Sequence, residues 1–175
     1  MSTNDTVLML ANGHAGNPAL RGYHPELPRF QQALCFALKE LAQKIVSDGE
    51  GITRVIEVAV TGAASGLDAR RAADAIARSC LVKTAWAGGD PNWGRLMAAL
   101  GYSGARVREE LVDICFDGVS AVRGGQSGRC PEARLRASVR KPRFKITINL
   151  HIGDAEYTVY TTDLTAAYVR LNMGE

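Results

Sequence analysis

The sequence is poor in the residues that build disulfide frameworks and metal centres. It has four cysteines and three histidines among 175 residues, and no two cysteines form a C-x-x-C pair. The histidines share no metal-ligand spacing with the cysteines, so we expect no metal site. Cys35, Cys80 and Cys115 lie in apolar sequence, which predicts small core side chains, whereas Cys130 lies in a glycine-rich stretch and is expected nearer the surface. This pattern favours a reduced, cytoplasmic protein over a disulfide framework.

Long hydrophobic runs and a strong excess of one charge are also missing. The apolar run 7–11 is too short for a membrane span or a signal peptide, and residues 1–6 carry no basic segment. The net charge is only +3. The one basic cluster, residues 134–145, is typical of a solvated surface rather than of a nucleic-acid footprint. We therefore expect neither a membrane nor nucleic acid as a partner.

Nucleotide-binding loops and catalytic triads are not visible either. Neither G-x-x-x-x-G-K nor G-x-G-x-x-G occurs. Residues 123–128 are only weakly similar to the pyrophosphate loop of acetyl-CoA-binding enzymes. Three histidines are too few to argue for a Ser-His-Asp order or a Cys-His pair.

What is present is an ordinary globular composition with 46% apolar residues, which predicts one domain over residues 1–175. Alternating periods of apolar residues predict a mixed α/β fold, a sheet layered with helices. The expected helices are 28–47, 67–79, 92–100, 132–139 and 164–172. The expected strands are 6–11, 54–60, 81–86, 111–116, 145–152 and 156–161, with a glycine-rich loop at 118–131. The last two strands are expected to form a hairpin across Gly153–Asp154.

Four stretches have residue types that are unusual for plain core or plain surface: 2–6, 48–54, 83–95 and 168–175. In the second, Glu50 stands between two glycines, which could aim its carboxylate into a cleft and toward the ammonium group of an amino acid. A helix C-cap followed by a surface turn explains the same residues equally well. In the third, a strand-turn-helix junction is expected, with Asp90 capping the helix and both tryptophans packing. The first and fourth are compatible with a capped strand and an amphipathic tail.

Taken in order, these stretches resemble one family, the ornithine acetyltransferases, also called glutamate N-acetyltransferases. The resemblance covers residues 2–172, and its motifs are each weak but specific as an ordered set. The motifs are Ser2–Thr6, Leu10–Gly13, Asp48–Gly51, Leu81–Thr84, Asp90–Arg95, Asp163–Thr165 and Tyr168–Asn172. The resemblance implies the C-terminal part of the family's β chain and a partial fold of the amino-terminal-nucleophile kind.

The resemblance also implies a reaction. Family members cleave themselves before a threonine, which gives an α chain and a β chain that assemble as an α2β2 heterotetramer. The new N-terminal threonine takes the acetyl group from N-acetylornithine and passes it to glutamate, in arginine biosynthesis. The threonine's own α-amine acts as the base, and the α chain supplies the oxyanion hole. No cofactor is needed, although some members accept acetyl-CoA.

Two family substrate residues map onto this sequence. Glu50 is expected to hold the α-amine of the substrate, and Asn172 is expected near its carboxylate. The nucleophilic threonine is expected upstream of this chain. Thr3 has no free α-amine and is not a substitute for it. A family Ser or Thr beyond the asparagine is expected to be missing, and Gly89 stands where many members carry Glu. The chain alone is therefore expected to be inactive.

Two other functions remain open at this point. A degenerate β-like fragment could bind an amino acid or a partner without chemistry. A related self-processing aminopeptidase should lack the stretch Asp90–Arg95 that is present here. Met1 could be an internal residue of a longer reading frame, the start of a trimmed chain, or the start of a separate gene. A fragment of this kind is also expected to expose an apolar face that the α chain covers.

Overall fold

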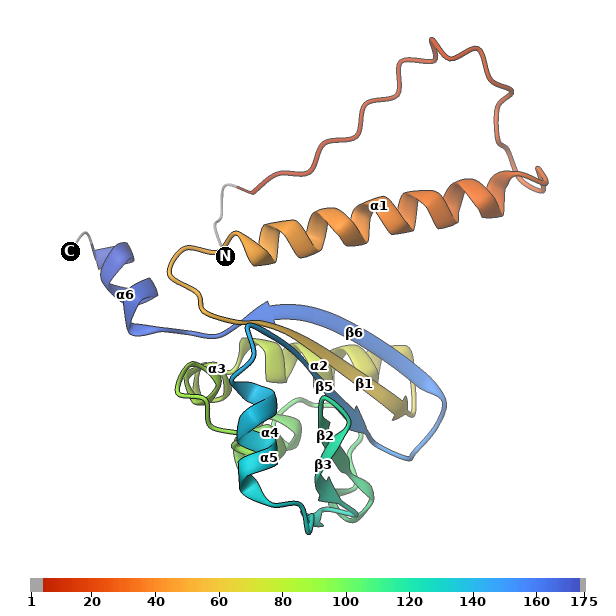
Figure 1. Ribbon diagram of the computed structural model, residues 1–175. Helices are drawn as coiled ribbons and strands as arrows, with labels where there is room; N and C mark the ends of the chain where they lie inside the picture. The colour runs from red at the N-terminus through yellow and green to blue at the C-terminus, as the bar shows by residue number, and fades with distance from the viewer. Residues whose placement is uncertain (1–4, 174–175) are drawn as a thin grey trace. The chain divides into compact units, whose positions relative to one another are not determined.

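The structure is a computed structural model in which residues 5–173 are described (Figure 1). Thr3 and most of the motif at 2–6 lie outside the described residues. The chain divides into two compact units, residues 1–49 and 50–175, and each is described by itself.

In the first unit, helix α1 spans Leu27–Ser47. Its start matches the preference of proline for the first turn of a helix, and it ends where the amide of Asp48 donates to the Lys44 carbonyl at 3.0 Å. The strand expected at 6–11 is wrong, because these residues form no regular secondary structure and are exposed, Leu10 by 93%. An apolar run becomes a strand only where a neighbouring strand edge accepts its hydrogen bonds. Among residues 5–173, no helix is long and apolar enough to cross a membrane.

The second unit is built on a six-stranded mixed sheet. The strands are β1 (Val55–Ala63), β2 (Asp113–Phe116), β3 (Val119–Arg123), β4 (Gln126–Ser127), β5 (Arg143–Asn149) and β6 (Ala155–Thr162). Their order in the sheet is β4-β3-β2-β5-β1-β6. Of the strand pairs formed by the described residues, β1 with β5 alone runs parallel. The glycine-rich stretch expected as a loop therefore contains two short strands, which turn at Gly124 and Gly125, both with positive φ.

The hairpin expected between the last two strands is wrong. β1 lies between β5 and β6, so that Val58 pairs with Ile146 on one side and with Val159 on the other. The connection reverses the direction of the chain but passes across the end of β1, so β5 and β6 are not neighbours in the sheet. The amide of Gly153 donates to the Gly62 carbonyl at 3.0 Å, and a Cβ at Gly153 would lie 2.6 Å from the Ala63 carbonyl oxygen. Glycine is thus needed for close approach of two backbones, not for a two-residue hairpin turn.

The helices that the structure describes in this unit are α2 (Gly66–Arg78), α3 (Cys80–Ala87), α4 (Trp93–Gly101), α5 (Glu132–Val139) and α6 (Ala166–Met173), together with a 3-10 turn at Glu109–Leu111. The strand expected at 81–86 is wrong, since this stretch is α3. Ser79 caps the helix by accepting from the Val82 amide at 3.4 Å. The buried residues Val82, Ala85 and Trp86 follow the three- and four-residue spacing of one helix face, which outweighs the strand propensity of the stretch.

One cluster of buried side chains joins α2, α3, α4 and α5 to one face of the sheet. In β1, Ile56, Val58 and Val60 point into this core, and Phe144, Ile146 and Ile148 do so in β5. The alternate residues form the opposite face of the sheet, where Lys145 Nζ and Glu57 Oε1 are 2.8 Å apart.

The expectation for the cysteines is partly wrong. Cys35 and Cys80 are exposed and Cys115 is half-buried. Cys80 lies in the first turn of α3, away from its buried face, and Cys115 lies between the buried residues Ile114 and Phe116 on β2, so it points to the other side of the sheet. Cys130 is half-buried and packs against the core cluster.

Candidate functional site

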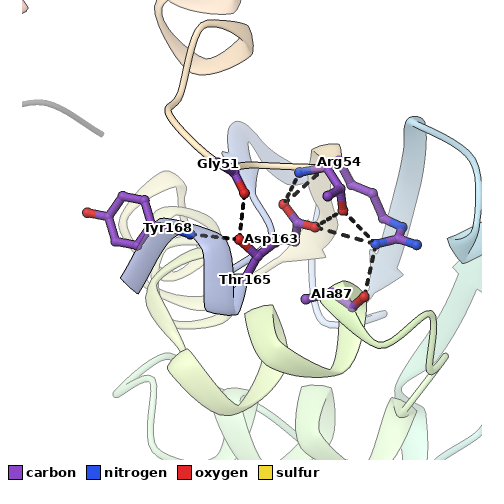
Figure 2. A network of polar contacts seen from close by, with 7 residues as sticks. Gly51, Arg54, Ala87, Asp163, Thr165 and Tyr168 are labelled. Carbon is purple, nitrogen blue, oxygen red and sulfur yellow. Dashed lines mark hydrogen bonds and ion pairs between the residues drawn. The ribbon is translucent and has the colours of Figure 1, made fainter. Parts of the chain in front are cut away.

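A buried carboxylate joins the start of β1 to the segment before α6. The side chain of Asp163 is fully buried. Its Oδ1 accepts the backbone amides of Thr53 at 3.0 Å and Arg54 at 3.1 Å, and its Oδ2 accepts the Thr53 hydroxyl and Arg54 Nη1 (Figure 2). A buried carboxylate is tolerated only when its oxygens are paired in this way.

Arg54 connects this carboxylate to the end of α3. Its Nη1 donates to the Ala87 carbonyl at 3.1 Å and lies 3.4 Å from Asp163 Oδ2. The side chain is only 15% exposed, and its Nε is buried with no hydrogen-bond partner among the described residues. The charge of Arg54 is therefore balanced mainly by Asp163.

Lys83 lies close to the same carboxylate. Its carbonyl accepts the Leu164 amide at 3.2 Å, which holds the segment after Asp163 against α3. Burial lowers the pKa of the Lys83 ammonium below its usual value, while Coulombic interactions with Cys80 and Asp163 act in the opposite direction.

A second polar contact lies two residues further on, at the start of α6. The Thr165 hydroxyl donates to the Gly51 carbonyl at 2.5 Å and accepts the Tyr168 amide at 3.0 Å, so it caps the helix (Figure 2). Gly51 has a φ of 65°, and a Cβ there would lie 2.7 Å from the Tyr168 backbone nitrogen. Only glycine allows this approach. We refer to Gly51, Thr53, Arg54, Asp163 and Thr165 together as the clamp.

The two residues expected to bind substrate lie on the two elements that the clamp joins. Glu50 is exposed and directly precedes Gly51. Asn172 is exposed on α6, and its Nδ2 donates to the Tyr168 carbonyl at 2.8 Å. Because Gly51 contacts the backbone of Tyr168, the turn that carries Glu50 lies against the helix that carries Asn172. Their roles toward substrate stay a prediction.

The model of the ArgJ family matches residues 1–174 of this sequence. The chain belongs to the ArgJ family. It is 50% identical over 173 residues to the arginine biosynthesis bifunctional protein ArgJ of Geobacter sulfurreducens. This match covers 98% of the present chain and 44% of the Geobacter protein. The protein of the same name from Syntrophotalea carbinolica is 45% identical, with the same coverage. The chain thus spans less than half the length of these curated relatives.

A solved structure confirms the expected fold class. The crystal structure of the arginine biosynthesis bifunctional protein argJ from Bacillus halodurans is 41% identical to this chain and superimposes with a TM-score of 0.93. The match covers 100% of this chain and 83% of that chain. The α/β fold with a mixed sheet and the resemblance read from the ordered motifs are both confirmed.

The stretch 83–95 of this ArgJ-family chain differs in detail from the expectation. The α4 helix is capped by Asn92, whose Oδ1 accepts the Arg95 amide at 3.2 Å, and Asp90 instead accepts from Asn92 Nδ2 at 3.1 Å. Proline at 91 separates Asp90 from the first turn. Trp86 is 1% exposed and packs edge-on against Phe144, with ring centroids 6.2 Å apart, so its role is structural.

Gly89, which stands where many family members are expected to carry Glu, lies close to two arginine side chains. Its φ is 67°, and a Cβ there would lie 3.3 Å from Arg140 Cγ and 3.9 Å from Arg54 Nη2. A longer side chain at this position would therefore reach between two guanidinium groups. This is where an acidic residue would find partners, and glycine leaves that contact unmade.

An acid–base pair outside the clamp lies at the opposite end of the central strands. His151 Nε2 is 3.0 Å from Asp113 Oδ2, and the Gly124 amide donates to Asp113 Oδ1 at 2.8 Å. Partial burial raises the pKa of the Asp113 carboxyl, but the hydrogen bonds from Gly124 and His151 outweigh it and hold that pKa below its usual value. Within residues 5–173, no group of three or more His, Cys, Asp or Glu side chains could hold a metal ion.

Sequence reasoning missed Asp163 and Thr165 as structural centres of the site. Both lie in one of the family motifs, but their partners are more than 100 residues away in the chain. The available signal was an acidic residue directly after a strand of β-branched residues, where a surface turn is the ordinary interpretation.

Proposed function

We propose that this chain is the C-terminal, substrate-binding part of a glutamate N-acetyltransferase that moves an acetyl group from N-acetylornithine to glutamate in arginine biosynthesis. The relatives that match it are named arginine biosynthesis bifunctional proteins. The observation that carries the proposal is the docking of the Glu50 turn on α6, which bears Asn172. Both side chains are exposed, and a carboxylate and an amide suit the ammonium and carboxylate groups of an amino acid.

The bond-making groups are assigned to the rest of the family protein. The chain corresponds to 44% of the Geobacter sulfurreducens relative, so more than half of such a protein lies outside the matched part. In this proposal, that part supplies the oxyanion hole and the threonine whose α-amine activates its own hydroxyl. Because the threonine carries the acetyl group between substrates, no resident cofactor is required, and acetyl-CoA would serve only as another donor. Exchange between soluble metabolites suits a cytoplasmic enzyme.

An apolar surface on α1 supports an α chain as partner, in an α2β2 assembly. Phe30, Leu34, Leu38, Leu41 and Ile45 recur at three- and four-residue steps along one side of the helix, and we call them the α1 stripe. Phe30 is 50% exposed, Leu38 45% and Leu41 42%. A contiguous apolar surface of this kind marks an interaction site more often than a free face.

The decisive experiment measures acetyl transfer by this chain when it is assembled with the rest of the family protein. Glu50→Ala should raise the KM for the amino-acid substrate by roughly tenfold to a hundredfold, the range expected for one charge-assisted hydrogen bond. Asp48→Ala, which removes an exposed carboxylate two residues away, is the matched control and should leave KM within about twofold.

Three results would decide against the proposal. An unchanged KM in Glu50→Ala would remove Glu50 from the site. Robust turnover by the chain alone would contradict the assignment of the nucleophile to another part of the protein. If the chain binds ornithine or glutamate in calorimetry but the assembled protein transfers no acetyl group, the chain is a binding module without chemistry.

A further inference from the structure

We propose that Thr165 is a positioning residue for substrate binding, because its hydroxyl sets the turn that carries Glu50 against the helix that carries Asn172. The inference rests on the proposed function, in which these two side chains hold the two ends of an amino acid. It adds a residue that does not itself touch the substrate.

One hydroxyl makes the connection. Thr165 Oγ1 donates to the carbonyl of Gly51, the residue after Glu50, and accepts the amide of Tyr168. The carbonyl of Tyr168 in turn accepts from Asn172 Nδ2 at 2.8 Å. A short series of hydrogen bonds therefore links the neighbour of Glu50 to the side chain of Asn172 through Thr165 and Tyr168. Figure 2 shows the two bonds that Thr165 makes, to Gly51 and to Tyr168.

The packing of α6 makes this hydroxyl important. None of the residues of α6 described in the structure is fully buried, so hydrophobic burial contributes little to fixing the helix. Its position depends on polar contacts at its first turn. A helix cap made by a Thr hydroxyl contributes about 1 kcal/mol, and here the same hydroxyl also bonds the facing turn.

Thr165 and Asp163 bind opposite ends of the segment 50–54. Thr165 binds the end that contains Glu50, and Asp163 binds the end that leads into β1. Asp163 accepts hydrogen bonds from the amides of Thr53 and Arg54, which directly precede β1, whereas the Thr165 hydroxyl donates to the carbonyl of Gly51. Loss of the Thr165 hydroxyl should therefore release the Glu50 turn while Asp163 still holds the strand. This separates a positioning role from general support of the sheet.

The experiment compares two substitutions in the assembled protein. Thr165→Val keeps the shape of the side chain but removes the hydroxyl, and it should raise the KM for N-acetylornithine about tenfold with kcat within about twofold, because binding groups rather than reacting groups are displaced. Thr165→Ser keeps the hydroxyl and should restore KM to within about twofold of the original. Ser65→Ala removes the cap of α2, where Ser65 accepts the Asp68 amide, and controls for loss of a helix cap elsewhere.

A double substitution tests whether Thr165 acts through Glu50. If it does, Thr165→Val should raise KM little further when Glu50 is already alanine, because the effects of coupled residues are not additive. Hydrogen exchange gives a reading that does not depend on activity. The Tyr168 amide should exchange at least about tenfold faster in Thr165→Val and at the original rate in Thr165→Ser.

The outcomes separate the two proposals. If Glu50→Ala raises KM but Thr165→Val does not, the positioning role is overturned and the proposed function stands. If neither changes KM, the proposed function fails and this inference fails with it. If Thr165→Val lowers kcat or stability without changing KM, Thr165 is merely structural. The same conclusion follows if Ser65→Ala and Thr165→Val change KM equally.

Discussion

At the scale of a residue, the buried carboxylate of Asp163 holds together two segments that are far apart in the sequence. Its side chain has no solvent contact and accepts hydrogen bonds from two residues at the start of β1. In the sequence it is simply an acidic residue between a strand and a helix. Its importance comes from Arg54, which is 109 positions away and whose guanidinium has little access to water.

Replacing this carboxylate should therefore be costly. Asp163→Ala leaves the Arg54 charge buried without its partner, and we expect the free energy of unfolding of the second unit to fall by about 3 kcal/mol or more. Urea unfolding followed by fluorescence of the buried Trp86 measures this change. Glu132→Gln breaks the exposed ion pair with Arg136 and should cost less than about 0.5 kcal/mol. Similar losses of unfolding free energy in the two variants would show that the buried ion pair stabilises the protein no more than an exposed one.

At the scale of an element, the contact between the Glu50 turn and α6 depends on a glycine. Gly51→Ala should destabilise the second unit by about 2 to 3 kcal/mol, because alanine is strained at a φ of 65° and its Cβ would meet the Tyr168 amide nitrogen. Gly101→Ala, on a helix with open space around the position, should be neutral or stabilising by up to about 1 kcal/mol. Thermal or urea unfolding of both variants tests the difference, and a neutral Gly51→Ala would contradict the described approach.

The same scale shows which elements sequence patterns can predict. Helices with a clear apolar stripe or caps, such as α1 and α2, were expected almost at their observed bounds. Strands were harder, because pairing is set by distant residues. β5 and β6 follow each other in the chain with a glycine between them, yet β1 lies between them in the sheet. The Leu81–Trp86 stretch is apolar enough for a buried strand, and only the cap at Ser79 and the spacing of its buried residues give a helix.

At the scale of the whole molecule, the ordered motifs were a better guide than any single element. They identified the family and selected Glu50 and Asn172, which the structure brings to facing elements. They could not show what holds these elements together, because the hydrogen bonds of Thr165 and Asp163 join segments more than 100 residues apart. The contacts of the clamp form only in the folded chain, so the motifs that contain its residues did not show which of them pair.

The α1 stripe gives the last prediction. If the rest of the family protein covers it, the chain alone should self-associate as its concentration rises, and light scattering should report a mass above that of one 18.8 kDa chain. Leu38→Lys with Leu41→Lys should suppress this association and weaken assembly with the rest of the protein. Leu67→Lys, which changes a 58% exposed leucine on α2, should do neither. Circular dichroism of each variant checks that α1 still forms. A clean monomer of the original chain at high concentration would instead mean that the stripe is not an interaction surface.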